Sequence, residues 1–208
     1  MNVEAVTIDA YGTLVSLRNP VPFLRAELAA RGLDLGEGAV QAAFAAEVAF
    51  YVERSHEGRD EATLALLRRD CAAVFLEATG AELDPDEFTP AFLASLAFEE
   101  VPGAAAACRA LRTEGLRLAV VSNWDVGLHE HLDALGLGEL VDAVVTSAEA
   151  GAPKPAPAVF ELALARLGAR PERTVHVGDA DADAEGARAA GLRFEPAPLS
   201  DAAARILA

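Results

Sequence analysis

Four short runs of apolar residues are spaced along the chain, and polar residues follow each run directly. The runs are VEAVTI (3–8), LRLAVV (116–121), VDAVVT (141–146) and TVHVG (174–178). Continuous apolar runs of this length, rich in Val, are typical of strands that are buried on both faces of a sheet. We therefore predict four strands of one buried sheet.

Segments with helical spacing alternate with the last three runs. They are PGAAAACRALRTEG (102–115), DVGLHEHLDALGLG (125–138) and PAPAVFELALARLG (155–168). Pro near the start or Gly at the end marks the boundaries of each segment. Strands that alternate with helices at this spacing form βαβ units, so the sequence predicts an α/β fold with a doubly wound, Rossmann-like parallel sheet.

The interval between the first and second runs has a different pattern. Residues 16–98 hold amphipathic helical patterns, such as PFLRAELAARG (22–32), and no convincing strand. Two Pro-containing segments flank the interval as expected hinges: LRNPVP (17–22) and FEEVPG (98–103). We predict a discontinuous core domain of residues 1–15 and 99–208, and an inserted α-helical domain of residues 16–98.

The composition is that of a water-soluble globular chain, with 52% hydrophobic and 24% charged residues and a mean hydropathy of +0.23. No apolar run approaches the roughly 20 residues that span a bilayer. The N-terminus lacks the basic start and the cleavage site of a signal peptide, so we expect a cytoplasmic protein. Cys71 and Cys108 lie far apart in Ala-rich helical stretches, and we expect buried, reduced thiols.

The charge balance narrows the choice of partner. With 17 basic and 33 acidic residues, the net charge of −16 repels polyanions, so we expect neither nucleic acid nor an anionic membrane as a partner. A small anionic substrate needs a local cation, and Lys154 is the one lysine among the 17 basic residues. The oligomeric state is left open between a monomer and a homodimer.

Polar side chains gather where the four predicted strands end. They are Asp9; Ser122 and Asn123; Ser147 and then Lys154; and Asp179, Asp181 and Asp183. Each one alone is better explained as the cap of a following helix. Ligands of open α/β sheets bind beyond the carboxyl ends of the strands, however, and four polar ends on one sheet edge favour a site.

These residues predict a site for transferring an anionic group. Asp9 and Asp179 would repel each other unless a hard cation lay between them, and Mg²⁺ takes one or two protein carboxylates together with substrate oxygens. Lys154 would neutralise the remaining charge, and Ser122 would donate a hydrogen bond to the substrate. A carboxylate in such a site can attack an electrophile to form a covalent intermediate, which water then hydrolyses.

In their order, the motifs DAYGT (9–13), VVSN (120–123), KP (154–155) and VGDADAD (177–183) resemble those of the haloacid dehalogenase-like (HAD) superfamily of aspartate-nucleophile hydrolases. The resemblance implies that Asp9 is the nucleophile, that Thr13 orients it, and that Ser122, Asn123 and Lys154 bind the transferring group. It also implies an Mg²⁺ site and a cap. The implied ligands are Asp9, the backbone carbonyl of Tyr11, Asp179 and, at the margin, Asp183, and the cap is the helical insertion. Trp124 either lines the substrate entrance or packs between helix and cap.

The tyrosine at position 11 makes more than one function possible for this site. Phosphatases of the superfamily usually carry a second Asp there, which protonates the leaving oxygen, and a tyrosine side chain has an ordinary pKa near 10. The form Asp-x-Tyr-Gly-Thr resembles L-2-haloacid dehalogenases, whose halide leaves without a proton. Those enzymes differ at the fourth motif, carry Tyr at the position of Phe160, and place a cationic Arg early in the cap, where residues 37–48 have none. We weigh an Mg²⁺-dependent phosphatase of a small phosphomonoester first, a 2-haloacid dehalogenase second, and a non-catalytic binder of a phosphorylated ligand third.

Overall fold

The computed structural model describes residues 3–208. The chain forms two compact units, which are Met1–Ser16 with Glu99–Ala208, and Leu17–Phe98. We call the first the core unit and the second the helical unit. Their limits lie within one residue of the predicted domain boundaries, and the assignment of the two units as domains stays a prediction. Every helix in residues 3–208 is too short or too polar to cross a lipid bilayer.

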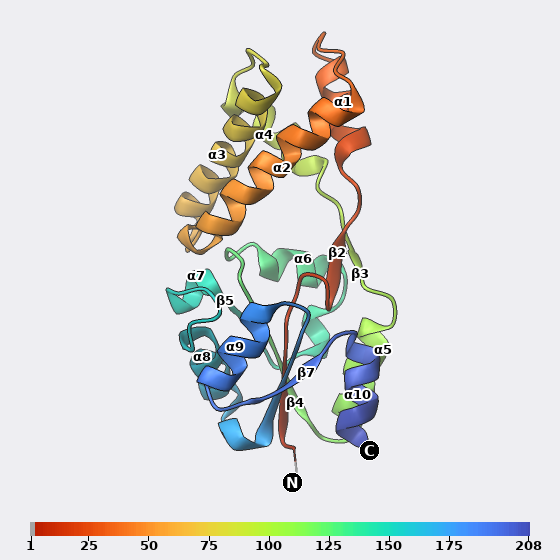
Figure 1. The fold of residues 1–208 in the computed structure, drawn as a ribbon, viewed down its shortest axis with the longest axis vertical. Helices are drawn as coiled ribbons and strands as arrows, with labels where there is room; N and C mark the ends of the chain where they lie inside the picture. The colour runs from red at the N-terminus through yellow and green to blue at the C-terminus, as the bar shows by residue number, and fades with distance from the viewer. Residues whose placement is uncertain (1–2) are drawn as a thin grey trace. The chain divides into compact units, whose positions relative to one another are not determined.

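A parallel five-stranded sheet lies at the centre of the core unit (Figure 1). Its strands are β1 (Ala5–Ile8), β4 (Arg117–Ser122), β5 (Ala143–Thr146), β6 (Thr174–Gly178) and β7 (Arg193–Pro196), in the spatial order β5-β4-β1-β6-β7. The four predicted strands are all present, and the α/β prediction is confirmed. Strand β7 was not predicted from the sequence. RFEP is a short edge strand that contains two charged residues and a proline, and it lacks the apolar run found in the neighbouring strands.

Helices cover both faces of this sheet. They are α5 (Ala104–Thr113), α6 (Leu128–Ala134), α7 (Ser147–Ala150), α8 (Ala158–Leu167), α9 (Asp181–Ala189) and α10 (Leu199–Leu207), with short 3₁₀ turns η2 (Gly138–Leu140) and η3 (Pro171–Arg173). Figure 1 shows α8 and α9 on one side and α5 with α10 on the other. This two-sided covering is the doubly wound arrangement that the sequence predicts.

Local signals set the ends of α8. The helix begins directly after Pro157, and it ends at Gly168, which has a φ of 60° in the left-handed region. Its inner face is fully apolar, and Val159, Phe160 and Ala163 are completely buried. They pack against Val121 and other apolar residues of the parallel strands. The predicted Pro and Gly signals therefore act as expected.

The helical unit contains α1 (Val21–Ala29), α2 (Glu37–Arg54), the 3₁₀ turn η1 (Ser55–Glu57), α3 (Glu61–Thr79) and α4 (Pro85–Ala94). Its own hydrophobic core includes Phe75, Phe88 and Phe92, all of which are almost fully buried. The rings of Phe75 and Phe88 are stacked with their centroids 6.0 Å apart. The inserted helical region predicted from the periodicity of this interval is confirmed.

Two short strands stand where the chain enters and leaves the helical unit. β2 (Val15–Leu17) and β3 (Phe98–Glu100) pair as a two-stranded sheet. The expectation that residues 16–98 hold no strand is therefore wrong at both ends. Three-residue strands are too short to show a periodic pattern, and the pairing depends on contacts about 80 residues apart in sequence.

Candidate active site

The carboxyl ends of three neighbouring strands bring the predicted acids together. β1 lies between β4 and β6, and Ile8 is in register with Val120 on one side and Val177 on the other. Asp9 follows β1 directly, and its backbone N–H donates to the Val177 carbonyl at 2.8 Å. Asp179 follows β6 in the same way, so parallel pairing carries both carboxylates to one edge of the sheet.

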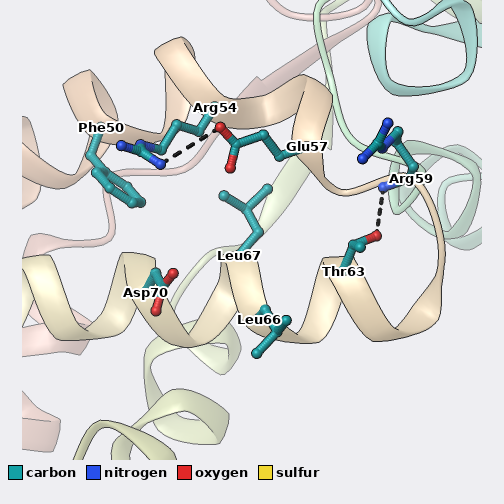
Figure 2. A pocket seen from close by; sticks show the side chains of 8 residues that line it. All are labelled: Phe50, Arg54, Glu57, Arg59, Thr63, Leu66, Leu67 and Asp70. Atoms are coloured by element: carbon teal, nitrogen blue, oxygen red, sulfur yellow. Dashed lines mark hydrogen bonds and ion pairs between the residues drawn. The ribbon is translucent and has the colours of Figure 1, made fainter.

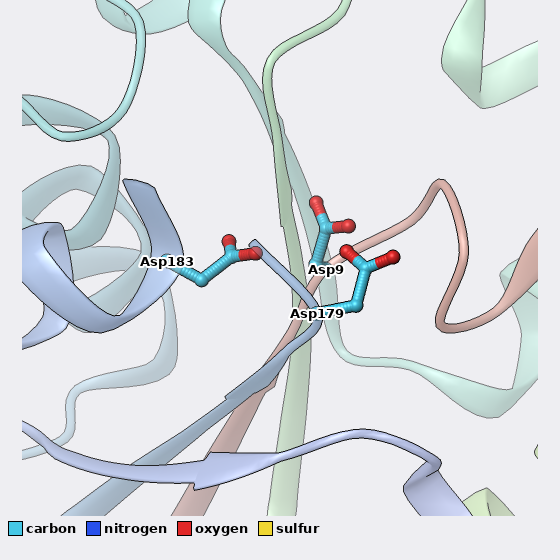
Figure 3. A group of neighbouring side chains, drawn as sticks. All are labelled: Asp9, Asp179 and Asp183. Carbon is cyan, nitrogen blue, oxygen red and sulfur yellow. The ribbon is translucent and has the colours of Figure 1, made fainter. Parts of the chain in front are cut away.

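Three aspartates form one acidic group at this edge (Figure 3). One carboxylate oxygen from each of Asp9, Asp179 and Asp183 lies within 4.8 Å of the others. Asp9 and Asp183 are buried, whereas Asp179 is exposed. The prediction named these three residues, and the fold brings all three together.

Lys154 joins two of these carboxylates. Its Nζ atom lies 2.5 Å from Asp9 Oδ1 and 2.5 Å from Asp183 Oδ1, and it also donates to the Val121 carbonyl at 3.1 Å. Burial acts to lower the pKa of Lys154, but the charges of Asp9 and Asp183 outweigh burial and raise it. Lys154 is therefore a buried ammonium ion whose three protons all have acceptors.

The acidic group has a net negative charge that a divalent cation would neutralise. Three carboxylates and one ammonium carry two net negative charges, because burial lowers the pKa of the neighbouring His176 and keeps it neutral. The pKa of Asp179 is raised by burial and by the charges of Asp9 and Asp183. Hard cations such as Mg²⁺ take oxygen ligands of this kind, so the residues fit the predicted metal.

Two glycines make space for the acids. Gly12 has a φ of 82°, and a Cβ atom there would overlap the Asp179 carboxylate. A Cβ atom at Gly178 would overlap the Asp183 carboxylate in the same way. Because any larger residue at either position would displace an aspartate, the two glycines keep the acidic group compact.

Asn123 holds the backbone of Lys154. The Asn123 Nδ2 atom donates to the Lys154 carbonyl at 3.1 Å, and the Lys154 N–H donates to Asn123 Oδ1 at 2.6 Å. Both ends of the amide are thus engaged by the lysine segment. This arrangement positions Lys154, and the predicted contact of Asn123 with a substrate stays a prediction.

Two hydroxyls predicted to act near Asp9 differ in their contacts. Ser122 Oγ donates to Asp9 Oδ1 at 3.1 Å, so it touches the predicted nucleophile. Thr13 Oγ1 is buried without a hydrogen-bond partner among residues 3–208. Thr13 lies in the turn that follows Asp9, and its predicted role in orienting Asp9 stays a prediction.

Tyr11 and Trp124 form an aromatic pair beside the acids. Their ring centroids lie 6.4 Å apart, at an interplanar angle of 52°. Tyr11 is 52% exposed, whereas Trp124 is 6% exposed. Trp124 is therefore buried beside Tyr11, and both expectations for it, at the substrate entrance or between helix and cap, stay predictions.

His176 is hydrogen-bonded directly to Asp183 of the acidic group, a contact that the sequence did not indicate. Its Nε2 atom lies 3.0 Å from Asp183 Oδ1, and its Nδ1 atom lies 3.0 Å from Thr7 Oγ1. The His176 side chain is fully buried, and both of its ring nitrogens are hydrogen-bonded. The available signal was the pair of polar residues, Thr7 and His176, inside two apolar strands.

A separate surface hollow lies within the helical unit, between α2 and α3, with a volume of about 310 Å³ (Figure 2). Arg54 lies 5.0 Å from the centre of the Phe50 ring and 3.6 Å from Glu57 Oε1. The Arg59 N–H donates to Thr63 Oγ1 at 2.9 Å. These side chains contact one another at the surface, and none of them belongs to the acidic group at the strand ends.

Comparison with known proteins agrees with the geometry of the core unit. A family model described as a haloacid dehalogenase-like hydrolase matches residues 3–191. The haloacid dehalogenase-like hydrolase domain-containing protein 3 of Bos taurus is 42% identical over 110 residues, which are 50% of this chain and 44% of that protein. The ribulose-1,5-bisphosphate 5-phosphatase of Halopiger xanaduensis is 38% identical over 122 residues, or 56% of this chain and 50% of that protein.

The chain thus spans about half the length of these curated relatives. Among solved structures, the defluorinating L-2-haloacid dehalogenase Rha0230 superposes with a TM-score of 0.78, covering 100% of this chain and 96% of that one. The sequences are 21% identical, so this likeness shows a shared fold.

Proposed function

This chain belongs to the haloacid dehalogenase-like hydrolase family, and we propose that it is an Mg²⁺-dependent phosphatase that acts on a small phosphomonoester. The acidic group carries this proposal. Asp9, Asp179 and Asp183 supply oxygen ligands around two uncompensated negative charges, a set that suits a divalent cation. A halide-releasing site has no need of that cation. The half-length similarity to a sugar-bisphosphate phosphatase also supports the proposal.

In this proposal, Asp9, Asp179, Asp183 and the backbone carbonyl of Tyr11 hold the cation. When bound, Mg²⁺ supplies charge neutralisation and polarises the phosphoryl oxygens. Lys154 adds a fixed positive charge, which is buried and held by Asn123. The backbone of the lysine segment and the side chain of Asn123 therefore set where that charge stands.

Asp9 is the proposed nucleophile. Its Oδ1 atom accepts hydrogen bonds from Lys154 Nζ and Ser122 Oγ. Within residues 3–208, no hydrogen bond engages Asp9 Oδ2, so its lone pairs are available for attack on phosphorus. Attack gives an aspartyl phosphate, which water then hydrolyses to regenerate the carboxylate.

One observation favours a second candidate, a 2-haloacid dehalogenase. Tyr11 stands where a phosphatase needs a proton donor, and a departing halide requires none. In that reaction, Asp9 would attack the carbon that bears the halogen, and Lys154 and Ser122 would hold Asp9 as they do here. The acidic group around Asp179 would then have no role in the reaction, and we place this candidate second for that reason.

Phosphate release from a panel of phosphomonoesters, including ribulose bisphosphate, tests the proposal. We expect turnover that requires Mg²⁺ and disappears in Asp9→Asn. Glu185→Gln, which changes an exposed acid of α9 outside the acidic group, serves as the matched control and should behave like the wild type. Halide release from 2-haloacids that persists in the presence of a chelator would establish the dehalogenase instead. Ligand binding without any turnover would establish a non-catalytic binder.

A further inference from the structure

We infer that this site is built for substrates whose leaving group departs as a stable anion without being protonated. The matching class is the acyl, enol and aryl phosphates, rather than phosphate esters of ordinary alcohols. The inference rests on the proposed phosphatase function, and it narrows that function to one class of substrate. It follows from the hydrogen-bond state of each group around Asp9.

The Tyr11 side chain is a poor donor of a proton to the leaving group. A phenol is a far weaker acid than a carboxylic acid. Across residues 3–208, no hydrogen bond joins the Tyr11 hydroxyl to Asp9, Asp179 or Asp183. The ring instead lies against Trp124 and is half exposed. Tyr11 therefore shapes the edge of the site without supplying an acid.

The protons of Lys154 are already committed. An ammonium has three donors, and those of Lys154 go to Asp9 Oδ1, Asp183 Oδ1 and the Val121 carbonyl. Ser122 gives its single proton to Asp9. Donation to a leaving group from either side chain would break a bond that holds the nucleophile in place.

The remaining acids are committed as well. Asp183 accepts hydrogen bonds from Lys154, His176 and the backbone N–H of Ala180, and is almost fully buried. Asp179 is the exposed carboxylate that the proposed cation requires. Among the described residues that contact Asp9 or the acidic group, no proton donor is left for a departing oxygen.

The bond changes decide which substrates suit such a site. An Asp9 oxygen forms a bond to phosphorus, the bond from phosphorus to the leaving oxygen breaks, and the electron pair stays on that oxygen. A carboxylate, enolate or phenolate holds this charge, whereas an alkoxide needs a proton, and loss of general acid catalysis typically costs 10²- to 10⁴-fold in rate. Water then attacks phosphorus, Asp9 leaves as a carboxylate, and the proton of the water passes to solvent.

The test is a series of phosphates of graded leaving-group acidity: acetyl phosphate, 4-nitrophenyl phosphate, phenyl phosphate and glycerol phosphate. Measured as kcat/KM with Mg²⁺, wild-type turnover should fall steeply along the series. Tyr11→Asp should weaken the dependence of kcat/KM on leaving-group acidity, and so flatten the series, by raising glycerol phosphate hydrolysis about 10²-fold or more. Tyr11→Phe should leave the series as steep as in the wild type, because the hydroxyl takes no part.

Three results would overturn the inference, and they are distinguishable. Mg²⁺-dependent turnover with a flat series would show that some other acid protonates the leaving group, while the phosphatase function stands. A series that changes slope in Tyr11→Phe would assign the acid to the hydroxyl. Absence of phosphate release from every compound, acetyl phosphate included, would remove the phosphatase function itself. The wild-type and Tyr11→Phe series decide the matter even if Tyr11→Asp fails to fold.

Discussion

Asp183 is held by neighbours on three sides. Lys154 and His176 both donate to Oδ1, and the Ala180 N–H donates to Oδ2 at 3.0 Å. Burial acts to raise the pKa of Asp183, but the His176 hydrogen bond and the Lys154 charge hold it well below its usual range. An ionised carboxylate only accepts, so His176 Nε2 carries the proton, and Nδ1 accepts from the Thr7 hydroxyl.

This arrangement makes His176 a positioning residue for the proposed metal site. We expect His176→Leu to raise the Mg²⁺ concentration for half-maximal phosphate release about 10- to 100-fold, as for other partners of metal ligands. His176→Gln should recover most of the loss, because its amide N–H can replace the ring donor. Equal effects of Leu and Gln on the Mg²⁺ requirement would show that His176 serves packing alone, and thermal unfolding of both variants controls for stability.

At the scale of elements, the contact between α2 and α3 buries a carboxyl group. Figure 1 shows these helices packed side by side, and Glu47 of α2 is only 5% exposed. Burial raises the pKa of Glu47 to about 7, although the Cys71 thiol on α3 donates a hydrogen bond that lowers it. Within residues 3–208, Cys71 and Cys108 are buried thiols that form no disulfide, as the sequence predicts.

Glu47 should make the stability of the protein depend on pH. A carboxyl with a raised pKa in the folded state stabilises the fold below its unfolded pKa of 4.5, and this contribution is lost as the pH rises to about 7. The loss corresponds to about 3 kcal/mol, since one pKa unit is worth about 1.4 kcal/mol. Glu47→Gln should therefore be more stable than the wild type at pH 8.

Urea unfolding followed by helical circular dichroism at pH 5 and pH 8 measures this difference. Glu53→Gln, at an exposed position of the same helix, is the matched control and should keep the wild-type pH dependence. An unchanged pH dependence in Glu47→Gln would mean that Glu47 is ionised without cost in the folded protein.

At the scale of the whole molecule, the chain leaves the core unit and returns at nearly the same place. β2 and β3 are paired, and the Arg18 N–H donates to the Ala97 carbonyl at 2.9 Å. The two ends of the helical unit are thus close enough for a short turn to join them. All five strands of the parallel sheet and the three aspartates of the acidic group belong to the core unit.

We therefore expect the core unit to fold when residues 18–97 are replaced by a flexible turn of about four residues. Fluorescence of Trp124, the one tryptophan of the chain, should report a single cooperative unfolding transition. Mg²⁺ should raise its Tm, because a ligand of the folded state stabilises that state, and Asp179→Asn should abolish the rise. A non-cooperative transition would show that the core unit depends on the helical unit.

The sequence by itself determined the order of elements and the acids at the strand ends. Apolar runs and Pro and Gly signals are local, so β1, β4, β5 and β6 could be located without knowing their partners. A parallel sheet also obliges the residues after its strands to meet at one edge. Asp9 and Asp179 could therefore be placed in one site from their positions in the chain.

Only the tertiary structure decided which side chains engage one another. The bridge from Lys154 to Asp9 and Asp183 and the hydrogen bonds of Asn123 with the lysine backbone join residues 29 to 145 positions apart. The pairing of β1 with β6 brings together residues 169 positions apart. His176 lies in an apolar run, and its partner Thr7 stands opposite it only because β1 and β6 are adjacent. Such contacts depend on strand order and register, which periodicity along a single chain does not encode.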